Sequence, residues 1–300
     1  MGNWFAKFAH ISCAVMNQQE TVERLRKIGI KPFEFYSFPP LVGKWSVRGV
    51  PVEPGDVAGP VPPIGAWIGG PELEIQQASR GSVYWDFMEA RGDGYHHVAF
   101  AVNDLDRVVA ALEERGLNVL FAGKWEGGGW AYVESDELGG MIFEFFENAD
   151  LLGESTEISS TFRSFRHVGA VVPDLARTTR FLAGMGSGPF LPSFSSDQGT
   201  ATFRGRPMDG SHKRVSAVLG EMTLELIQPT KGSSPYSEFL EATGGGIHHL
   251  GFSVEDLGKE TTRLEQRGAN LLWTGHGESR RLAELEMSAN GLIVELVEST

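Results

Sequence analysis

The sequence predicts an α+β protein made of four copies of one βαβββ unit, a strand followed by a helix and three more strands. Two observations lead to this prediction. Four segments open alike, at residues 8–30, 95–117, 165–187 and 247–269. The agreement is longer between the two halves of the chain, where residues 82–105 parallel residues 234–257 and residues 139–147 parallel residues 289–298. An internal repeat of this kind decides the architecture.

Each unit opens with about seven residues that alternate between small and apolar types, the pattern of a strand. A polar helix-start signal follows in three units, at Asn103-Asp104, Pro173-Asp174 and Glu255-Asp256. Apolar residues then recur at helical spacing, most clearly in Leu105, Val108, Val109 and Leu112. Glycines stand where the helix should end in a left-handed residue, namely Gly29, Gly116 and Gly268. Short strands broken by Gly and Pro complete the unit.

The repeat divides the chain into two domains, residues 1–150 and residues 165–300, joined by a polar linker at residues 151–164. The first domain carries an insertion at residues 38–65 that is too rich in Pro and Gly for a helix. We expect a surface loop there. The alternative is a lid in which Trp45 covers a site.

Composition narrows the class of protein. The formal net charge of −13 argues against nucleic-acid and anionic-membrane partners, because these need a basic face. A single cysteine excludes an internal disulfide framework and fits a reducing compartment. The N-terminal stretch lacks a long apolar segment, so we expect neither a signal peptide nor a membrane span. A cytoplasmic protein is the prediction.

Paired histidines stand in two of the opening strands, in GYHHVAF at residues 94–100 and GIHHLGF at residues 246–252. Alternate residues of a strand share a face, so His97 shares its face with small residues and His96 with bulky ones. His249 and His248 repeat this arrangement. We therefore expect the second histidine of each pair to face an open space and the first to pack beneath the helix. The same parity places His10 and His167 on the open faces, and Cys13 in the core.

Each half also has two glutamates in apolar strands, where an unpaired carboxylate is costly to bury. They are Glu74, Glu144, Glu225 and Glu295. Two histidines and two glutamates suit a first-row divalent ion and leave coordination positions for water or substrate. Any one of these histidines or glutamates alone is best explained as an ordinary buried residue. The set of two histidines and two glutamates, however, occurs once in each half, with its members at corresponding strand positions. The sequence therefore predicts two candidate metal sites.

The four-unit pattern resembles the vicinal oxygen chelate superfamily, which includes glyoxalase I, methylmalonyl-CoA epimerases, extradiol dioxygenases, and fosfomycin- and bleomycin-resistance proteins. The resemblance is strongest to the epimerases, through residues 87–117 and 127–147. It covers most of both halves and implies tandem domains with cupped mixed sheets, each around a metal. Carried over by position, the implied ligands are His10, Glu74, His97 and Glu144, and His167, Glu225, His249 and Glu295.

One departure from the epimerase pattern concerns the catalytic base. The epimerases place a glutamate on the strand before the second ligand, but residues 64–68 and 215–219 hold no carboxylate. A ligand glutamate could dissociate and serve instead, as in glyoxalase-type relatives. The candidates for catalysis are therefore Glu144, Glu295, Glu134 and His212, with Asp136 and Lys213 as further loop candidates.

The resemblance implies a divalent-metal-dependent isomerase, epimerase or lyase, with Zn, Mn, Co, Ni or Fe as the ion. Such an ion would stabilise the enolate that forms when a small carbonyl substrate, aromatic or a CoA thioester, loses a neighbouring proton. A homodimer is allowed. One rival is an extradiol-type dioxygenase using His167, His249 and Glu295, and Glu225 counts against it as a crowding fourth ligand. The other rival is a non-catalytic resistance protein, which would need no metal ligands.

Overall fold

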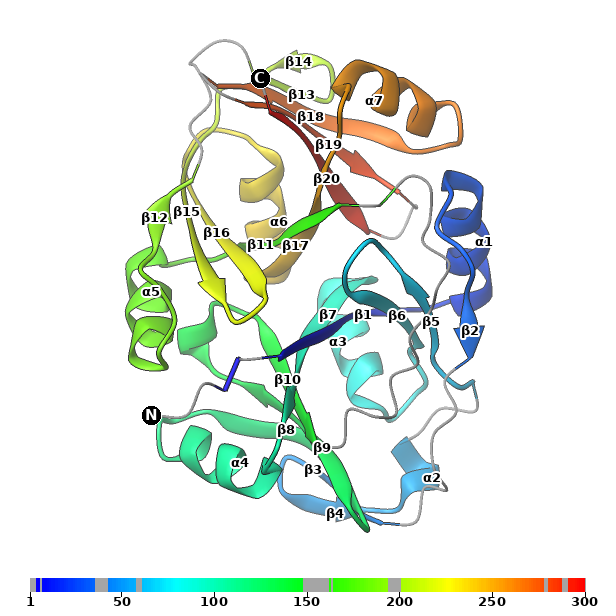
Figure 1. Cartoon of the computed structure of the whole chain (residues 1–300), viewed down its shortest axis with the longest axis vertical. Coiled ribbons are helices and arrows are strands. Elements are labelled where there is room, and N and C mark those ends of the chain that lie inside the picture. The colour runs from blue at the N-terminus through cyan, green and yellow to red at the C-terminus, as the bar shows by residue number, and fades with distance from the viewer. Residues whose placement is uncertain are drawn as a thin grey trace.

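The computed structural model of the chain describes residues 4–5, 7–35, 43–57, 61–147, 162, 164–193, 201–277, 280–287 and 291–299. Two large curved sheets, one from each half of the chain, form the molecule (Figure 1). The prediction of an α+β protein with two tandem repeats is confirmed.

The first sheet has ten strands and is mixed. β1 pairs in parallel with β6 and antiparallel with β7, and β7 pairs in parallel with β10. The strands follow the order β2 (Glu34–Phe35), β5 (Ile64–Trp67), β6 (Glu72–Gln77), β1 (Lys7–Val15), β7 (Gly94–Val102), β10 (Ile142–Glu147), β9 (Gly128–Glu134), β8 (Asn118–Trp125), β3 (Lys44–Val47) and β4 (Val50–Val52).

The second sheet repeats this topology strand for strand. Its order is β12 (Leu191–Pro192), β15 (Ser211–Leu219), β16 (Met222–Lys231), β11 (Phe165–Val171), β17 (Gly246–Ser253), β20 (Ile293–Ser299), β19 (Arg280–Glu286), β18 (Asn270–His276), β13 (Thr202–Phe203) and β14 (Arg206–Pro207). β1 and β7 thus lie side by side near the centre of the first sheet, and β11 and β17 near the centre of the second.

The helices begin where the polar start signals predicted. Asp104, Asp174 and Asp256 each accept a hydrogen bond from the third residue that follows, and Asn17 does the same in the first unit. The four repeat helices are α1 (Gln18–Ile28), α4 (Leu105–Glu113), α5 (Leu175–Gly184) and α7 (Leu257–Glu265). The glycines predicted to be left-handed have positive φ, at 107° for Gly29, 84° for Gly116 and 99° for Gly268.

One face of each sheet packs against these helices and forms the core. Cys13, Val98 and Phe100 lie on this face with at most 1% exposure, together with Leu25 of α1 and Leu112 of α4. The predicted core position of Cys13 is confirmed. The opposite face of each sheet does not pack against these four helices.

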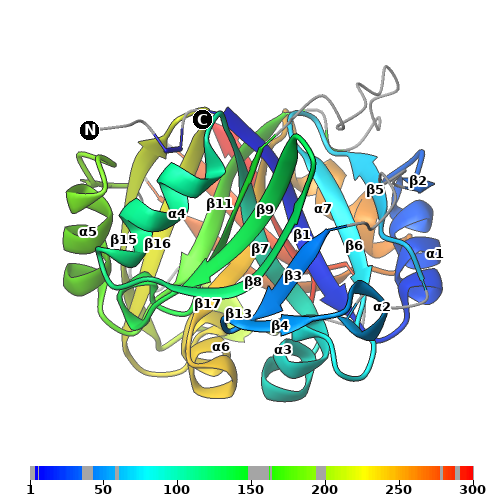
Figure 2. The same ribbon diagram turned by 90° about the horizontal axis from the view of Figure 1, so that it is seen from below.

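The two halves are tied together through α3 (Val83–Arg91) and α6 (Pro235–Thr243), which lie side by side (Figure 2). Arg91 donates to the backbone carbonyls of Gly140 and Gly245, one in each half. The Tyr95 hydroxyl donates to the carbonyl of Ile293. These contacts make one body of the two halves.

The insertion at residues 38–65 differs from the predicted surface loop. Within its described part, β3 and β4 form a hairpin that extends the first sheet beyond β8, and a short helix α2 spans Pro54–Val57. Trp45 is 7% exposed and packs edge to face on Trp130, with the ring centroids 4.7 Å apart. An indole of this size is stabilised by burial, which explains why the hairpin folds onto the sheet.

Most of the predicted linker at residues 151–164 lies outside the described residues. Phe162 is described and is fully buried against Phe252, with ring centroids 4.8 Å apart. Among the described helices, none is long and apolar enough to cross a bilayer.

Candidate metal centres

Strand pairing places the predicted ligands of the first half on one face of the first sheet. His10 of β1 pairs with Ala99 of β7, which pairs with Glu144 of β10. Ser12, the next residue of β1 on this face, pairs with His97 and with Glu74. Directly paired residues point to the same side of a sheet. The four side chains therefore meet on the face opposite the helices, and we call them the first centre.

The donor atoms of the first centre are close together and buried. His10 Nε2 and His97 Nε2 lie 3.3 Å apart, and Glu144 Oε2 is 3.0 Å from the former and 2.9 Å from the latter. Glu74 Oε2 stands farther off, 3.9 Å from each of the two nitrogens. All four residues are at most 7% exposed.

A proton on His10 offsets the charge of Glu144 in the first centre. Burial lowers the pKa of His10, but the hydrogen bond and charge of Glu144, with the charges of Glu74 and Glu72, outweigh it and raise the pKa to about 9. Burial raises the pKa of Glu144, yet the two imidazoles outweigh that and bring it to about 2. The metal-free centre therefore holds a His10 imidazolium facing a Glu144 carboxylate at neutral pH.

Strand parity predicted the place of His97 but not that of His96, because β7 bulges at His96, which packs on α3 rather than beneath the repeat helix α4. His97 faces the centre, whereas His96 packs against Phe87 and Tyr84 of α3. The two rings meet through their Nδ1 atoms, 2.8 Å apart. Burial, with the nearby charges of His97 and Arg91, lowers the pKa of His96, so its neutral Nδ1 can accept a hydrogen bond from His97 Nδ1. That bond fixes the His97 tautomer and leaves its Nε2 lone pair for an ion.

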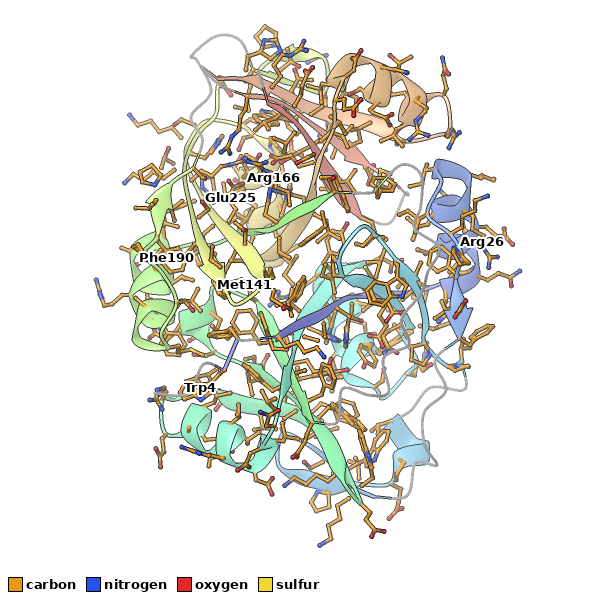
Figure 3. All side chains as sticks on the ribbon, viewed as in Figure 1. Trp4, Arg26, Met141, Arg166, Phe190 and Glu225 are labelled. Carbon is orange, nitrogen blue, oxygen red and sulfur yellow. The ribbon has the colours of Figure 1, made fainter. Side chains whose placement is uncertain are left out.

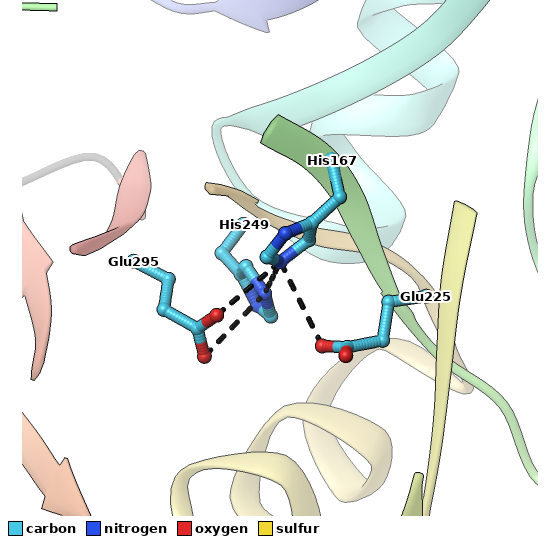
Figure 4. Close-up of side chains that lie close together, drawn as sticks. All are labelled: His167, Glu225, His249 and Glu295. Carbon is cyan, nitrogen blue, oxygen red and sulfur yellow. Dashed lines mark hydrogen bonds and ion pairs between the residues drawn. The ribbon is translucent and has the colours of Figure 1, made fainter. Parts of the chain in front are cut away.

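The second half brings together the equivalent four residues, which we call the second centre. His167 Nε2 and His249 Nε2 lie 3.2 Å apart. Glu295 Oε1 is 3.3 Å and Glu225 Oε2 is 3.7 Å from His167 Nε2, on opposite sides of the imidazoles (Figure 4). One donor atom from each residue falls within 4.8 Å of all the others. All four residues are at most 4% exposed.

An arginine that the sequence analysis did not select enters the second centre. Arg214 of β15 places Nη1 3.0 Å from Glu225 Oε2 and 2.9 Å from Glu295 Oε2. Its side chain is 1% exposed. Arg166 of β11, labelled near Glu225 in Figure 3, adds a second positive charge in the electrostatic field of the same two carboxylates. The second centre therefore already contains a permanent cation.

A further buried carboxyl group belongs to this cluster. Glu284 of β19 pairs with Glu295 and places Oε1 3.5 Å from His249 Nδ1. It accepts a hydrogen bond of 2.6 Å from the Tyr236 hydroxyl. Burial and the charge of Glu295 raise the pKa of Glu284 to about 8, so it is protonated at neutral pH. Burial also lowers the pKa of His249, which stays neutral.

The first centre fits a divalent metal ion. Donors held about 2.1 Å from one ion in tetrahedral geometry are about 3.4 Å from one another. Those of His10, His97 and Glu144 lie 2.9 to 3.3 Å apart, whereas Glu74 stands outside this close group, 3.9 Å from each imidazole nitrogen. Glu74 Oε2 is buried and has no hydrogen-bond partner within the described residues, a costly state that an ion would relieve. The His₂Glu₂ donor set suits the ions that the sequence analysis named.

The second centre has the same donors, but its carboxylates are already paired. A divalent ion about 4 Å from the Arg214 guanidinium would meet a repulsion on the order of 8 kcal/mol at an effective dielectric constant near 20. The two histidines and two glutamates of the second centre would suit a metal by themselves, but the positive charge of Arg214 between the carboxylates opposes one.

The other candidates for catalysis lie beside the centres rather than in them. Glu134 ends β9, two residues beyond Tyr132, and its charge acts on Arg91. His212 of β15 packs on Tyr236 with ring centroids 4.8 Å apart, and burial with the charge of Arg214 lowers its pKa to about 3. Asp136 begins the 3-10 turn η1 (Asp136–Leu138). Lys213 follows His212 on β15, with its side chain on the other face.

Arg214 could have been found from strand parity. His212, Arg214 and Ser216 share one face of β15, and Ser216 pairs with Glu225. Reading the segment DGSHKRV as a loop hid this relation.

Comparison with known proteins gives the following likenesses. The model of the glyoxalase/bleomycin resistance protein/dioxygenase superfamily matches residues 9–133 and 166–283. An ethylmalonyl-CoA/methylmalonyl-CoA epimerase of Cereibacter sphaeroides is 30% identical over 138 residues, which are 43% of this chain and 93% of the relative. A 4-hydroxyphenylpyruvate dioxygenase of Hordeum vulgare is 26% identical over 202 residues, which are 61% of this chain and 45% of the relative.

Among solved structures, a mutant of 4-hydroxymandelate synthase from Streptomyces coelicolor superposes with a TM-score of 0.61 at 16% identity. The match covers 98% of this chain and 93% of that one. At this identity the likeness concerns the fold alone.

Proposed function

This chain belongs to the glyoxalase/bleomycin resistance protein/dioxygenase superfamily, and on that basis we propose that it is a metal-dependent isomerase, epimerase or lyase whose active site is the first centre. The observation that carries the proposal is the convergence of His10, His97 and Glu144 within 3.3 Å of one another, with Glu74 beside them. Within the described residues, no Lys or Arg pairs with either carboxylate. The space between these donors is therefore suited to an external cation.

A divalent ion bound there would polarise a substrate carbonyl and stabilise the enolate left when the neighbouring carbon loses its proton. The residues of the chain hold and orient the ion, and one carboxylate takes the proton. Glu144 contacts both imidazoles, whereas Glu74 Oε2 stands 3.9 Å from each. Glu74 is therefore the carboxylate better placed to turn toward a substrate, and Glu144 the one better placed to remain on the ion.

The substrate class follows from the relatives and from the surroundings of the centre. The epimerase relative acts on CoA thioesters and the dioxygenase relative on an aromatic keto acid, by their names, and both molecules contain a carbonyl group. Phe146 lies 5.9 Å from the His10 ring, and Tyr132 lies 4.5 Å from the His97 ring. Apolar rings beside the donors suit a substrate with an apolar or aromatic portion next to its carbonyl.

A dioxygenase is the second candidate, because the dioxygenase relative matches more of this chain than the epimerase does. The comparisons support both activities, so the choice depends on the site. The trio expected of a dioxygenase, His167, His249 and Glu295, is in contact. Arg214 donates a hydrogen bond to Glu295 of that trio, and its positive charge would repel a divalent ion there. A binding protein without a metal is the third candidate, and the buried donors of the first centre speak against it.

The proposal is tested by exchange of the substrate α-proton in D₂O, followed by proton NMR. The protein is loaded with Co²⁺ or Zn²⁺ and supplied with methylmalonyl-CoA, ethylmalonyl-CoA or 4-hydroxyphenylpyruvate. We expect metal-dependent exchange with at least one of these, and a loss of about 100-fold or more in His97→Ala. His276→Ala, a change of an exposed histidine on β18, is the matched control and should exchange at the wild-type rate.

Oxygen uptake by the Fe²⁺-loaded protein, with 4-hydroxyphenylpyruvate or catechol, separates the candidates. We expect none. Oxygen consumption that persists in His97→Ala would reject the proposal in favour of a dioxygenase centred on the second half.

A further inference from the structure

We infer that Arg214 takes, in the second centre, the place that a metal ion takes in the first, so that the chain binds a single metal ion and its second quartet is a metal-free ion-pair cluster. The inference shares with the proposed function the metal at the first centre. It goes beyond that function in assigning the second quartet a role without an ion.

The contacts of Arg214 are those of a cation between ligands. One nitrogen, Nη1, reaches Glu225 and Glu295 at 3.0 and 2.9 Å. The other, Nη2, donates to the Tyr236 hydroxyl and lies 4.0 Å from Glu284. The guanidinium carbon lies 5.5 Å from the centroid of the Tyr236 ring and 5.9 Å from that of Trp273. A planar guanidinium held by carboxylates and by aromatic rings is fixed from several directions.

The two halves differ at the strand position that Arg214 occupies. Gly65 of β5 pairs with Glu74 as Ser216 of β15 pairs with Glu225. Two residues before each stand Pro63 and Arg214, so the first half has no counterpart to the guanidinium. A permanent cation in only one of two otherwise equivalent quartets indicates that the two have different tasks.

A second difference concerns the group that bonds to the helix tyrosine, which is Tyr84 of α3 in the first half and Tyr236 of α6 in the second. Tyr132 pairs with Glu144 and meets the Tyr84 hydroxyl at 2.7 Å in the first half. At the equivalent position of the second half, Glu284 pairs with Glu295 and accepts from Tyr236. The second half thus replaces a phenol by a carboxyl group next to the guanidinium.

A third difference concerns the strand residues beneath the imidazoles. A Cβ at Gly169 would lie 2.2 Å from the His249 ring, and one at Gly251 would lie 2.2 Å from the His167 ring. The rings of the second centre therefore lie directly on their neighbouring strands. The first half has Ser12 and Ala99 at these positions, whose Cβ atoms exclude that placement.

Exclusion of a metal follows from the chemistry of the guanidinium. A histidine or lysine in a metal site can yield its proton to the solvent when an ion arrives, but an arginine keeps its charge. An ion could enter the second centre only if the guanidinium left its carboxylates and rings. Arg214 is 1% exposed, so that departure would require the surrounding strands to open.

Titration of the metal-free protein with Co²⁺, followed by visible absorption and by metal analysis after dialysis, tests the inference. We expect one equivalent in the wild type, none in His97→Ala, and one in His249→Ala. Two equivalents in the wild type, or loss of the ion in His249→Ala with retention in His97→Ala, would overturn it.

Replacement of the arginine gives the second measurement. Arg214→Met should bind a second equivalent of Co²⁺, and this second ion should disappear again in Arg214→Met combined with His249→Ala. Co²⁺ should also raise the melting temperature of Arg214→Met by more than that of the wild type. A folded Arg214→Met that still binds one equivalent would overturn the inference. If this variant does not fold, the Co²⁺ titrations of His97→Ala and His249→Ala test the inference instead.

These readouts measure no turnover, so the inference and the proposed function can fail separately. One equivalent at the first centre without proton exchange rejects only the function. Two equivalents with exchange reject only the inference, and a wild type that binds no metal rejects both.

Discussion

Arg214 Nη1 lies 2.9 Å from Glu295 Oε2, and this buried ion pair connects β15 with β20 across the second sheet. Removal of one partner of such a pair leaves an uncompensated charge in the interior. Arg214→Met in metal-free protein should therefore lower the free energy of unfolding by about 3–5 kcal/mol. Urea denaturation followed by circular dichroism measures the change. A loss below about 1 kcal/mol would mean that the pair is not formed as described.

Glu284→Gln provides the contrast within the same cluster. Because burial and Glu295 raise the pKa of Glu284 to about 8, its carboxyl is neutral at pH 7 and an amide replaces it with little change in charge or size. We expect a loss of no more than about 1 kcal/mol in the same denaturation experiment. A loss as large as that of Arg214→Met would show that Glu284 is ionised in the folded protein.

His96 should control the metal affinity of the first centre without touching the ion. In His96→Phe the packing on Phe87 and Tyr84 is kept, but His97 Nδ1 loses its partner. Loss of such an orienting bond costs about 10–100-fold in metal affinity. Competition with a chromophoric chelator measures it. His248→Phe, the matched change in the second half, should leave the affinity unchanged, and equal effects of the two variants would contradict the assignment.

The metal-free protein should lose stability as the pH rises from about 6.5 to 9. The pKa of His10 is about 9 in the folded state, raised by Glu144, Glu74 and Glu72 against the effect of burial, and 6.5 is its ordinary value. A raised pKa means that the folded state binds the proton more tightly, so this stabilisation is complete below pH 6.5 and is lost as the pH passes 9. The shift corresponds to a change on the order of 3 kcal/mol.

The pKa of Glu284 is raised from 4.5 to about 8, so its contribution has the same sign and is lost over an overlapping range of pH. The His10 contribution is therefore taken as the difference from His10→Gln. Thermal denaturation between pH 6 and 9.5 measures both proteins. Saturating Zn²⁺ should abolish the difference in slope, because an ion binds the neutral imidazole. A wild type whose slope equals that of His10→Gln without metal would contradict the pairing of His10 with Glu144.

Much of the fold could be predicted because the residues within each unit specify where its helix begins and ends and which faces are buried. Asp104 and Gly116 enclose a helix with Leu105, Val108 and Leu112 on its buried face, and the structure has this helix. Strand parity also predicted which histidine of each pair meets the glutamates. Parity is a local property, so it can be read without knowledge of the partner strand.

What the sequence could not supply depends on pairing between distant strands. Trp45 lies on a hairpin that is stable only because β8 accepts it, and the Pro-rich composition around it suggested a loop instead. Arg214 reaches the second centre because β15 pairs with β16 in one particular register. A shift of that register by one residue would turn the arginine to the other face. β15 and β16 are the two arms of a tight hairpin, however, so this relation was within reach of strand parity, and it was hidden because residues 209–215 were interpreted as a loop.

The central claim, that one metal ion binds between His10, Glu74, His97 and Glu144, is tested most directly by anomalous diffraction from crystals grown with Zn²⁺ or Co²⁺. We predict one strong anomalous peak per chain, within bonding distance of the two Nε2 atoms and of Glu144, and none between His167 and Glu295. A peak confined to the second centre, or no peak at the first, would contradict the claim.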